Sequence, residues 1–168
     1  MRESLSEKVI AQIGKAPELY HRLVLIVAPS GSGKTAALQD VATRTGAPLL
    51  NLNLELSRRM LDLTERQRAL QLPRLLDEVV GRDDPVVLLD NIEILFDVAL
   101  EQDPLRLLQG ISRNRTIVAA WNGTLRNGYL IYATPEHPEY QRYPSRQLVV
   151  VCQDLPSGPG AAQTGGTA

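Results

Sequence analysis

Unbroken apolar runs recur along this chain, separated by longer segments in which apolar residues follow helical spacing. Runs at 23–27, 86–89 and 116–121 contain no charged residue, which is typical of parallel strands covered on both faces. Two further strands are predicted at 49–54, where asparagines alternate with leucines, and at 147–152. Because these strands alternate with helical segments, the pattern predicts an α/β fold around a mostly parallel five-stranded sheet, with right-handed crossovers.

Capping signals mark the first two expected helices. Ser4 and Glu7 have the spacing of a capping box, so a short amphipathic helix should open the chain and end at Gly14. A second helix is expected from 34 to about 45, with Gly46 just past its end.

The segment from 57 to 80 is helical in pattern but should not form one continuous helix. Thr64 and Gln67 could restart it as a second capping box, and Pro73 should kink or break it. An Asp-Pro pair then predicts the start of a further helix over 103–110.

The last part of the chain carries turn signals. Asn127-Gly128 predicts a tight hairpin turn into a strand at 129–132, and a proline-containing loop leads on to the strand at 147–152. From 153 onward there is hardly anything to bury. We therefore expect one domain over 1–152, without a helical lid, and a disordered tail over 153–168.

Composition and charge exclude several classes of protein. The chain has 168 residues and a net charge of −1, so its overall charge does not draw it to nucleic acid or to an anionic membrane. No apolar run approaches the roughly 20 residues that a membrane span requires. Cys152 is the only cysteine, which excludes an intrachain disulfide, and we expect it to be buried at the end of the last strand. These features predict a cytoplasmic protein without a membrane partner.

A phosphate-binding motif follows the first apolar run directly. Residues 28–35 read Ala-Pro-Ser-Gly-Ser-Gly-Lys-Thr. Lys34 is placed to reach the β and γ phosphates of a nucleotide and the Thr35 hydroxyl to ligate Mg²⁺, while the helix that follows adds its positive end. Ala28 departs from the motif, which has glycine there. The residues expected to bind ATP are Pro29, Ser30, Gly31, Ser32, Gly33, Lys34, Thr35 and Ala36.

Acidic residues follow the apolar run at 86–89. Asp90 ends this run in the Walker B arrangement and is expected to hold Mg²⁺ together with Thr35. Many ATPases have a glutamate next, which polarises the attacking water, but this chain has Asn91. Either Glu93 is the catalytic base, or hydrolysis is slow or needs a partner. The alternative for Glu93 is an acid at the start of a helix, favoured by the helix dipole.

Three more residues are catalytic candidates. Asn122 ends the run at 116–121 and resembles the polar sensor residue of AAA+-type ATPases, although Asn122 and the next residue could equally form a turn. Arg113 and Arg115 precede the same run and could act in trans on a neighbouring subunit's γ-phosphate; a solvated turn is the alternative. The long separation between the two Walker elements leaves room for an extra strand, which predicts the additional-strand class of P-loop fold.

Other polar side chains allow two interpretations. Tyr20 and His21 could stack on adenine, or could simply pack. A group of arginines in the second helical region should form a solvated face, with a protein or nucleic-acid contact as the alternative; these are Arg58, Arg59, Arg66, Arg68 and Arg74.

Several strings together resemble the BrxF family, small P-loop proteins of type 3 BREX bacteriophage-exclusion systems. They are LVLIVAPSGSGKT at 23–35, NLNLELS at 51–57, LLDNIEILF at 88–96, SRNR at 112–115, AAWNG at 119–123 and HPEY at 137–140. The resemblance runs from about residue 5 to residue 152. It implies a subunit of a multi-component bacterial defence complex that distinguishes host from phage DNA by methylation. It also carries the site assignment onto Gly31, Gly33, Lys34, Thr35 and Asp90.

The sequence therefore favours an ATP-binding and ATP-hydrolysing subunit of an antiphage complex. A non-hydrolysing, nucleotide-dependent assembly module is the alternative, motivated by Asn91, and a small-molecule or nucleotide kinase is a third possibility. Expected partners are further copies of the chain and other BREX proteins. A contact with DNA stays open, and one made through partners is favoured.

Overall fold

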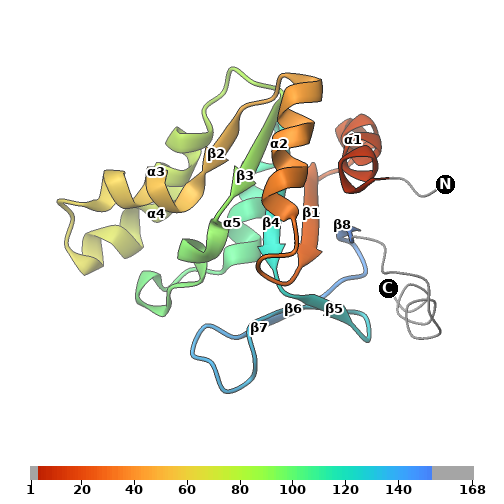
Figure 1. Cartoon of the computed structure of the whole chain (residues 1–168). Helices are drawn as coiled ribbons and strands as arrows, with labels where there is room; N and C mark the ends of the chain where they lie inside the picture. Colours follow the sequence, from red (N-terminus) through yellow and green to blue (C-terminus); the bar gives the residue numbers. More distant parts are fainter. Residues whose placement is uncertain (1–3, 153–168) are drawn as a thin grey trace.

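The computed structural model describes residues 4–152, so the tail predicted to be disordered lies outside the described residues. The main sheet has five strands in the order β2-β3-β4-β1-β8, and all neighbouring pairs are parallel (Figure 1). Because β4 lies between β1 and β3, the sheet has the predicted extra strand, and the α/β fold class is confirmed. The strands are β1 (Leu23–Ala28), β2 (Leu49–Asn51), β3 (Val86–Asp90), β4 (Thr116–Asn122) and β8 (Val149–Val151).

Helices cover both faces of this sheet, which gives three layers. Alternate residues of β1 serve the two layers: Leu25 joins the core on one face and Ile26 the core on the other. The first face is covered by α3 (Leu52–Met60), α4 (Glu65–Val80) and α5 (Pro104–Ile111), and the second by α1 (Leu5–Lys15) and α2 (Lys34–Thr45). Short 3-10 helices are η1 (Ala16–Glu18), η2 (Ile92–Phe96) and η3 (Val98–Leu100).

The predicted capping boxes are present, but two helix limits differ from the prediction. Ser4 caps α1 as expected, yet the helix does not end at Gly14. It continues to Lys15, because Gly14 has no positive φ and the N–H of Ala16 still donates to carbonyls of the last turn. In the second case α4 begins after Thr64 as predicted but runs without a break through Pro73. The only interruption of the segment 57–80 lies between α3 and α4, where the restart at Thr64 was also predicted.

The second strand is shorter than predicted. β2 stops at Asn51, whose side-chain oxygen accepts a hydrogen bond from the N–H of Leu54 at 3.1 Å. This cap starts α3 at Leu52. The alternation of asparagine and leucine therefore reflects a strand end followed by a capped helix.

A second, smaller sheet follows β4. It contains β5 (Thr124–Arg126), β6 (Tyr129–Tyr132) and β7 (Gln141–Pro144), in antiparallel order β5-β6-β7. The hairpin predicted at Asn127-Gly128 is confirmed, whereas β7 is a strand where a loop was expected.

Aromatic side chains join this small sheet to the main core. Tyr132 stacks on Phe96 with ring centroids 3.6 Å apart, and Trp121 meets Phe96 edge to face at 5.1 Å. The indole N–H of Trp121 donates to the carbonyl of Ile131 at 3.2 Å. The small sheet is therefore fixed to the end of β4 by stacking and by a hydrogen bond.

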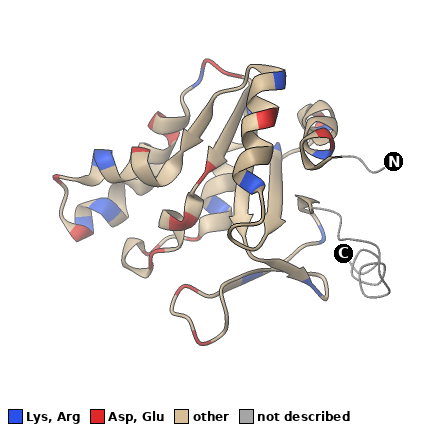
Figure 2. Ribbon diagram, viewed as in Figure 1, with Lys and Arg blue, Asp and Glu red and all other residues tan. Residues whose placement is uncertain are grey.

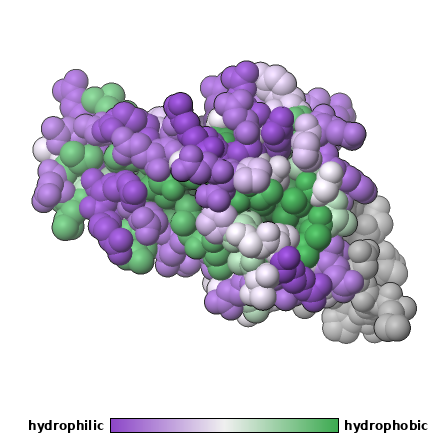
Figure 3. All heavy atoms as spheres, turned by 90° about the horizontal axis from the view of Figure 1, so that it is seen from above, coloured by the Kyte–Doolittle hydropathy of each residue, from purple (hydrophilic) through white to green (hydrophobic). Residues whose placement is uncertain are grey.

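The surface of the α3–α4 end is mostly polar. Four of the five arginines predicted to form a solvated face are exposed, whereas Arg68 is half-buried and donates to the carbonyl of Leu63 at 3.1 Å. Arg59 pairs with Glu55, and Arg74 pairs with Glu78. Apolar residues appear there in small groups among hydrophilic ones (Figure 3). Leu61, just after α3, has 73% of its surface exposed.

Cys152 is exposed, so the prediction that it is buried is wrong. In the part of the chain between 4 and 152, no helix has the length and apolar character needed to cross a membrane.

Candidate nucleotide-binding site

The predicted phosphate loop lies between the end of β1 and the start of α2. Gly31 and Gly33 have φ angles of +79° and +96°, a conformation that side chains with a Cβ rarely adopt. Space is open around both residues, because a Cβ placed on either would meet no atom within 4 Å. Ala28 is the last residue of β1 and has no positive φ, so its methyl group is compatible with the loop.

Lys34 is held under this loop by two backbone carbonyls. Its ammonium group donates to the oxygen of Ala28 at 2.9 Å and to that of Pro29 at 2.7 Å, and only 5% of the residue is exposed. Burial lowers the pKa of Lys34, while the nearby carboxylates of Glu93 and Asp90 act to raise it. A buried ammonium group with these carbonyl partners and neighbouring acids is in place to bind an anion.

The predicted metal ligands are in direct contact. The hydroxyl of Thr35, in the first turn of α2, donates to Oδ2 of Asp90 at the end of β3, at 2.6 Å. The other carboxylate oxygen of Asp90 accepts the backbone N–H of Asn91 at 2.9 Å. Hydroxyl and carboxylate oxygens are the hard ligands that Mg²⁺ prefers.

The residues present fit Mg-ATP. The open glycine loop and the N-terminus of α2 offer N–H donors for phosphates, and Lys34 adds a cation. The pair of Thr35 and Asp90 offers oxygen ligands for Mg²⁺ beside them. Among residues 4–152, no cluster of three or more His, Cys, Asp or Glu side chains could form a separate metal centre, so phosphate and water oxygens would complete the coordination of Mg²⁺.

Glu93 lies close to these groups. It lies in η2, which begins directly after Asn91. The backbone of Asn91 is left-handed, with φ +55°. Burial raises the pKa of Glu93, its own backbone N–H lowers it, and the charges of Asp90 and Lys34 raise and lower it respectively. Its carboxylate is therefore within electrostatic range of both Walker residues and is more basic than an exposed glutamate.

Asn122 ends β4 at the same edge of the sheet. In the register of the two strands it lies opposite Ala28, between the P-loop and β3, as expected of a sensor position. The N–H of Gly123 donates to the carbonyl of Ala28 at 3.1 Å. The Asn-Gly pair is thus part of the junction between β4 and the small sheet.

Residue Gly123 has a structural role that the sequence reasoning did not assign. A Cβ at this position would lie 2.0 Å from the carbonyl oxygen of Ile131 and 2.8 Å from Nε1 of Trp121. Only a glycine allows the small sheet to approach β4 this closely. The Asn-Gly string was the available signal, but it also fits an ordinary turn.

Two asparagines beside Asp90 were also missed. Asn51 pairs with Asp90 in the register of β2 and β3, and the N–H of Asn53 donates to the carbonyl of Asn91 at 3.0 Å. The start of α3 is therefore tied to the segment that follows β3. The available sequence signal was Asn51, which stands three residues before Leu54, the spacing of a helix cap.

The structure separates the two candidate arginines from the site of their own chain. Both precede β4 and so lie at the amino ends of the strands, whereas the P-loop follows the carboxyl end of β1. Arg113 is exposed and rests over the ring of Tyr20 at 5.1 Å, so an action on a neighbouring subunit stays a prediction for it.

Both predictions for Arg115, an action in trans and a solvated turn, are wrong. It is only 7% exposed, its guanidinium donates to the carbonyl of Ile111 at 2.8 Å, and it lies 3.9 Å from a carboxylate oxygen of Asp77. This side chain is held inside its own domain between α4 and α5. It is neither a solvated turn residue nor free to enter a neighbouring subunit.

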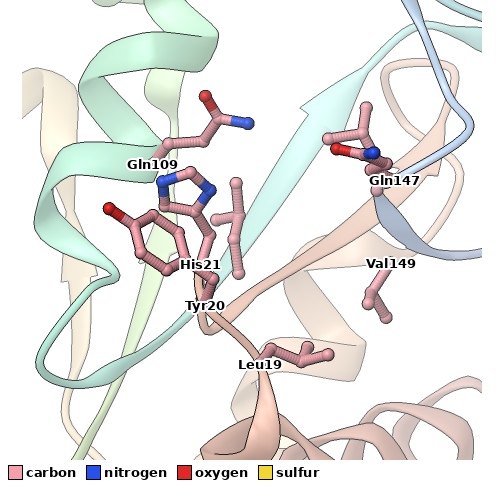
Figure 4. A pocket seen from close by; sticks show the side chains of 8 residues that line it. Leu19, Tyr20, His21, Gln109, Gln147 and Val149 are labelled. Carbon is pink, nitrogen blue, oxygen red and sulfur yellow. The ribbon is translucent and has the colours of Figure 1, made fainter.

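Tyr20 and His21 also lie away from the P-loop. They line a cavity of about 340 Å³ together with residues of α5 and of the segment leading into β8 (Figure 4). The two rings meet edge to face, with centroids 4.7 Å apart. The cavity is at the amino edge of the sheet, so these rings do not stack on a nucleotide bound at the P-loop of the same chain.

Comparisons with known proteins show a family match and a similar solved structure. The model of the family described as "ATPase family associated with various cellular activities (AAA)" matches residues 24–134, a segment that contains the P-loop, Asp90 and Asn122. Among solved structures, a chain of "Structure of C. elegans PCH-2" is similar, with 17% identity and a TM-score of 0.42; the match covers 91% of this chain and 42% of that one. This chain therefore spans less than half the length of that similar chain. A comparison with curated proteins gave no match.

Proposed function

Because the chain belongs to the ATPase family associated with various cellular activities (AAA), we propose that it binds Mg-ATP at the P-loop and hydrolyses it. The observation that carries this proposal is the contact of Thr35 with Asp90 at 2.6 Å, beside the buried ammonium group of Lys34. The polyphosphate would be held by the loop amides and Lys34. Thr35 and Asp90 would hold Mg²⁺, which neutralises phosphate charge when it is bound.

Glu93 is the residue we propose as the general base. Burial raises the pKa of its carboxyl group, and a base is most effective when its pKa is near the working pH. Asn122 would orient the water or the γ-phosphate from the end of β4. In this proposal hydrolysis depends on a carboxylate three residues after Asp90, where many ATPases use the next residue.

Steady-state phosphate release with Mg-ATP tests this function, with ATP binding measured separately by calorimetry. Glu93→Gln keeps the size of the side chain but removes the base, so it should bind ATP normally and lose most turnover. Lys34→Ala should lose both binding and turnover. Full turnover in Glu93→Gln would refute its role as the base, and no heat with ATP or GTP plus Mg²⁺ would refute the nucleotide site itself.

A non-hydrolysing assembly module is the second candidate, and the amide of Asn91 favours it. An amide is not a base, and this residue follows Asp90 directly. If the wild-type protein binds ATP without turnover, Asn91→Glu should create hydrolysis; if Glu93 is already the base, the same variant should change the rate only modestly. Turnover without any acceptor would also dismiss a small-molecule kinase.

We also propose that the protein acts in a BREX antiphage complex, together with other BREX proteins or further copies of itself. The sequence strings that resemble the BrxF family support this role, and the exposed Arg113 supports assembly around the nucleotide. Affinity purification from the native host with mass spectrometry should recover BREX components, and their absence would contradict the role. Light scattering with a non-hydrolysable ATP analogue should show a larger species, and an unchanged monomer would contradict nucleotide-linked assembly.

A further inference from the structure

The small sheet has one face that packs on the domain and one that does not. On the packed face, Leu130 and Tyr132 are buried in the main core. Side chains of a strand alternate between faces, so the positions between them form an outer face on all three strands. Those positions are Thr124 and Arg126 on β5, Tyr129 and Ile131 on β6, and Arg142 and Pro144 on β7.

Positive charge on this outer face is not neutralised by the protein. Arg126 and Arg142 are exposed, as is Arg146 in the segment just after β7. Among residues 4–152, none of the three forms an ion pair with a carboxylate, in contrast to the paired arginines of the α3–α4 end. The acidic residues of this region, Glu136 and Glu139, lie in the β6–β7 loop and not on the strands (Figure 2).

An aromatic ring lies beside two of these cations, Arg126 and Arg142. Tyr129 lies opposite Arg126 in the strand register, and the guanidinium of Arg142 lies over its ring, 4.2 Å from the centroid. Tyrosine rings and arginine planes on an open sheet provide stacking surfaces for unpaired bases, while arginines contact the backbone phosphates.

From this juxtaposition of Arg126, Tyr129 and Arg142 we infer that the outer face of the small sheet binds a single strand of nucleic acid. Charge complementarity selects a polyanion, and the stacked tyrosine and arginine select one with planar bases over an acidic protein segment. The net charge of −1 hides this surface in the composition, because the basic group is local.

The same surface is connected to the nucleotide site. The carbonyl of Ala28 accepts from the ammonium group of Lys34 at 2.9 Å and from the N–H of Gly123 at 3.1 Å. Gly123 is followed directly by β5. A nucleic-acid strand bound on the small sheet can therefore influence Gly123, the residue next to Asn122. We expect such binding to change ATP turnover. This second step rests on the proposed ATPase function, whereas binding does not.

Binding is tested by fluorescence anisotropy with the full chain, without ATP, over a range of salt concentrations. The probes are labelled oligothymidylate, labelled oligouridylate and a labelled duplex. The double variant Arg126→Ala/Arg142→Ala should weaken binding of both single strands about tenfold or more. It should also reduce the magnitude of the slope of log affinity against log salt by about 1.4, because two phosphates of the single strand are no longer neutralised.

A matched control removes the same charge elsewhere. The double variant Arg58→Ala/Arg82→Ala changes exposed arginines in α3 and after α4, and it should bind like wild type. Tyr129→Leu should weaken binding of single strands several-fold, whereas Tyr129→Phe should retain it. Thermal unfolding of every variant confirms that it is folded.

The inference is overturned if the two double variants bind alike, if only the duplex binds, or if a glutamate homopolymer competes as well as an unlabelled single strand. Retention of one single-stranded probe but not the other identifies DNA or RNA and supports the inference. Phosphate release with and without oligonucleotide then tests the connection. Unchanged turnover with a saturating bound strand would overturn the connection, and an inactive ATPase would count against the proposed function while the binding result stands.

Discussion

Gly123→Ala should be the most damaging small substitution at the junction of the two sheets. The new methyl carbon would lie 2.0 Å from the carbonyl oxygen of Ile131 and 2.8 Å from Nε1 of Trp121. Since real Cβ contacts stay beyond 3.0 Å, β6 has to move away by about 1 Å. The hydrogen bond of 3.2 Å between Trp121 and Ile131 is then lost.

The expected loss of stability combines two effects. Overpacking costs about 1–3 kcal/mol, and the broken hydrogen bond costs about 1 kcal/mol. The free energy of unfolding should therefore fall by about 2–4 kcal/mol, which lowers the Tm by about 5–15 °C for a domain of this size. The only tryptophan of the chain is Trp121, so its fluorescence should shift to the red as the contact opens.

Gly110→Ala provides the matched control. Gly110 lies in α5, and a Cβ there meets nothing within 4 Å, so alanine should stabilise the helix by about 0.5–1 kcal/mol. Thermal unfolding followed by circular dichroism, together with urea titration, measures both variants. If Gly123→Ala melts within about 2 °C of wild type, the close approach that we describe does not exist in solution.

Other substitutions give further tests. Arg115→Ala should lower the free energy of unfolding by about 2 kcal/mol, because a buried charge-assisted hydrogen bond is lost. Arg113→Ala should change it by less than about 0.5 kcal/mol. Equal effects in urea titrations would contradict the burial of Arg115. Burial raises the pKa of Glu93, so the native state holds its proton at higher pH than the unfolded state, and stability should fall as pH rises from the unfolded pKa through the native one. Glu93→Gln should remove that fall and be more stable than wild type at neutral pH; a lower Tm there would contradict the sign. Burial also raises the pKa of Tyr132 to about 12, so stability should fall as pH rises from about 10 to 12. Tyr132→Phe should lessen this alkaline loss, and an unchanged pH profile would refute it.

The fold was largely predictable because its signals are local and strong. Three apolar runs and two capping boxes set the positions of β1, β3, β4, α1 and α4. The P-loop and Asp90 come at the ends of apolar runs, and parallel strands bring such ends to one edge of a sheet. Sequence order alone therefore placed the two Walker elements together.

Other features depended on contacts that no local pattern shows. The capping of α3 by Asn51 competes with a strand that has the same residues. The third strand of the small sheet, β7, pairs a proline-rich segment with β6, although Pro144 lowers its strand propensity. The burial of Arg115 comes from the approach of α4 and α5, which lie far apart in sequence from one another.

The fixed position of Lys34 has a consequence for the strength of nucleotide binding. A free lysine side chain loses about 1.5–2 kcal/mol of rotamer entropy when it is immobilised, but this one is already restrained by the carbonyls of Ala28 and Pro29. An ammonium group carries three N–H donors, and these two bonds leave one of them for a phosphate. Much of the ordering that the lysine needs is therefore completed when the chain folds, and a variant that loosens the loop should lower affinity even if every phosphate contact survives.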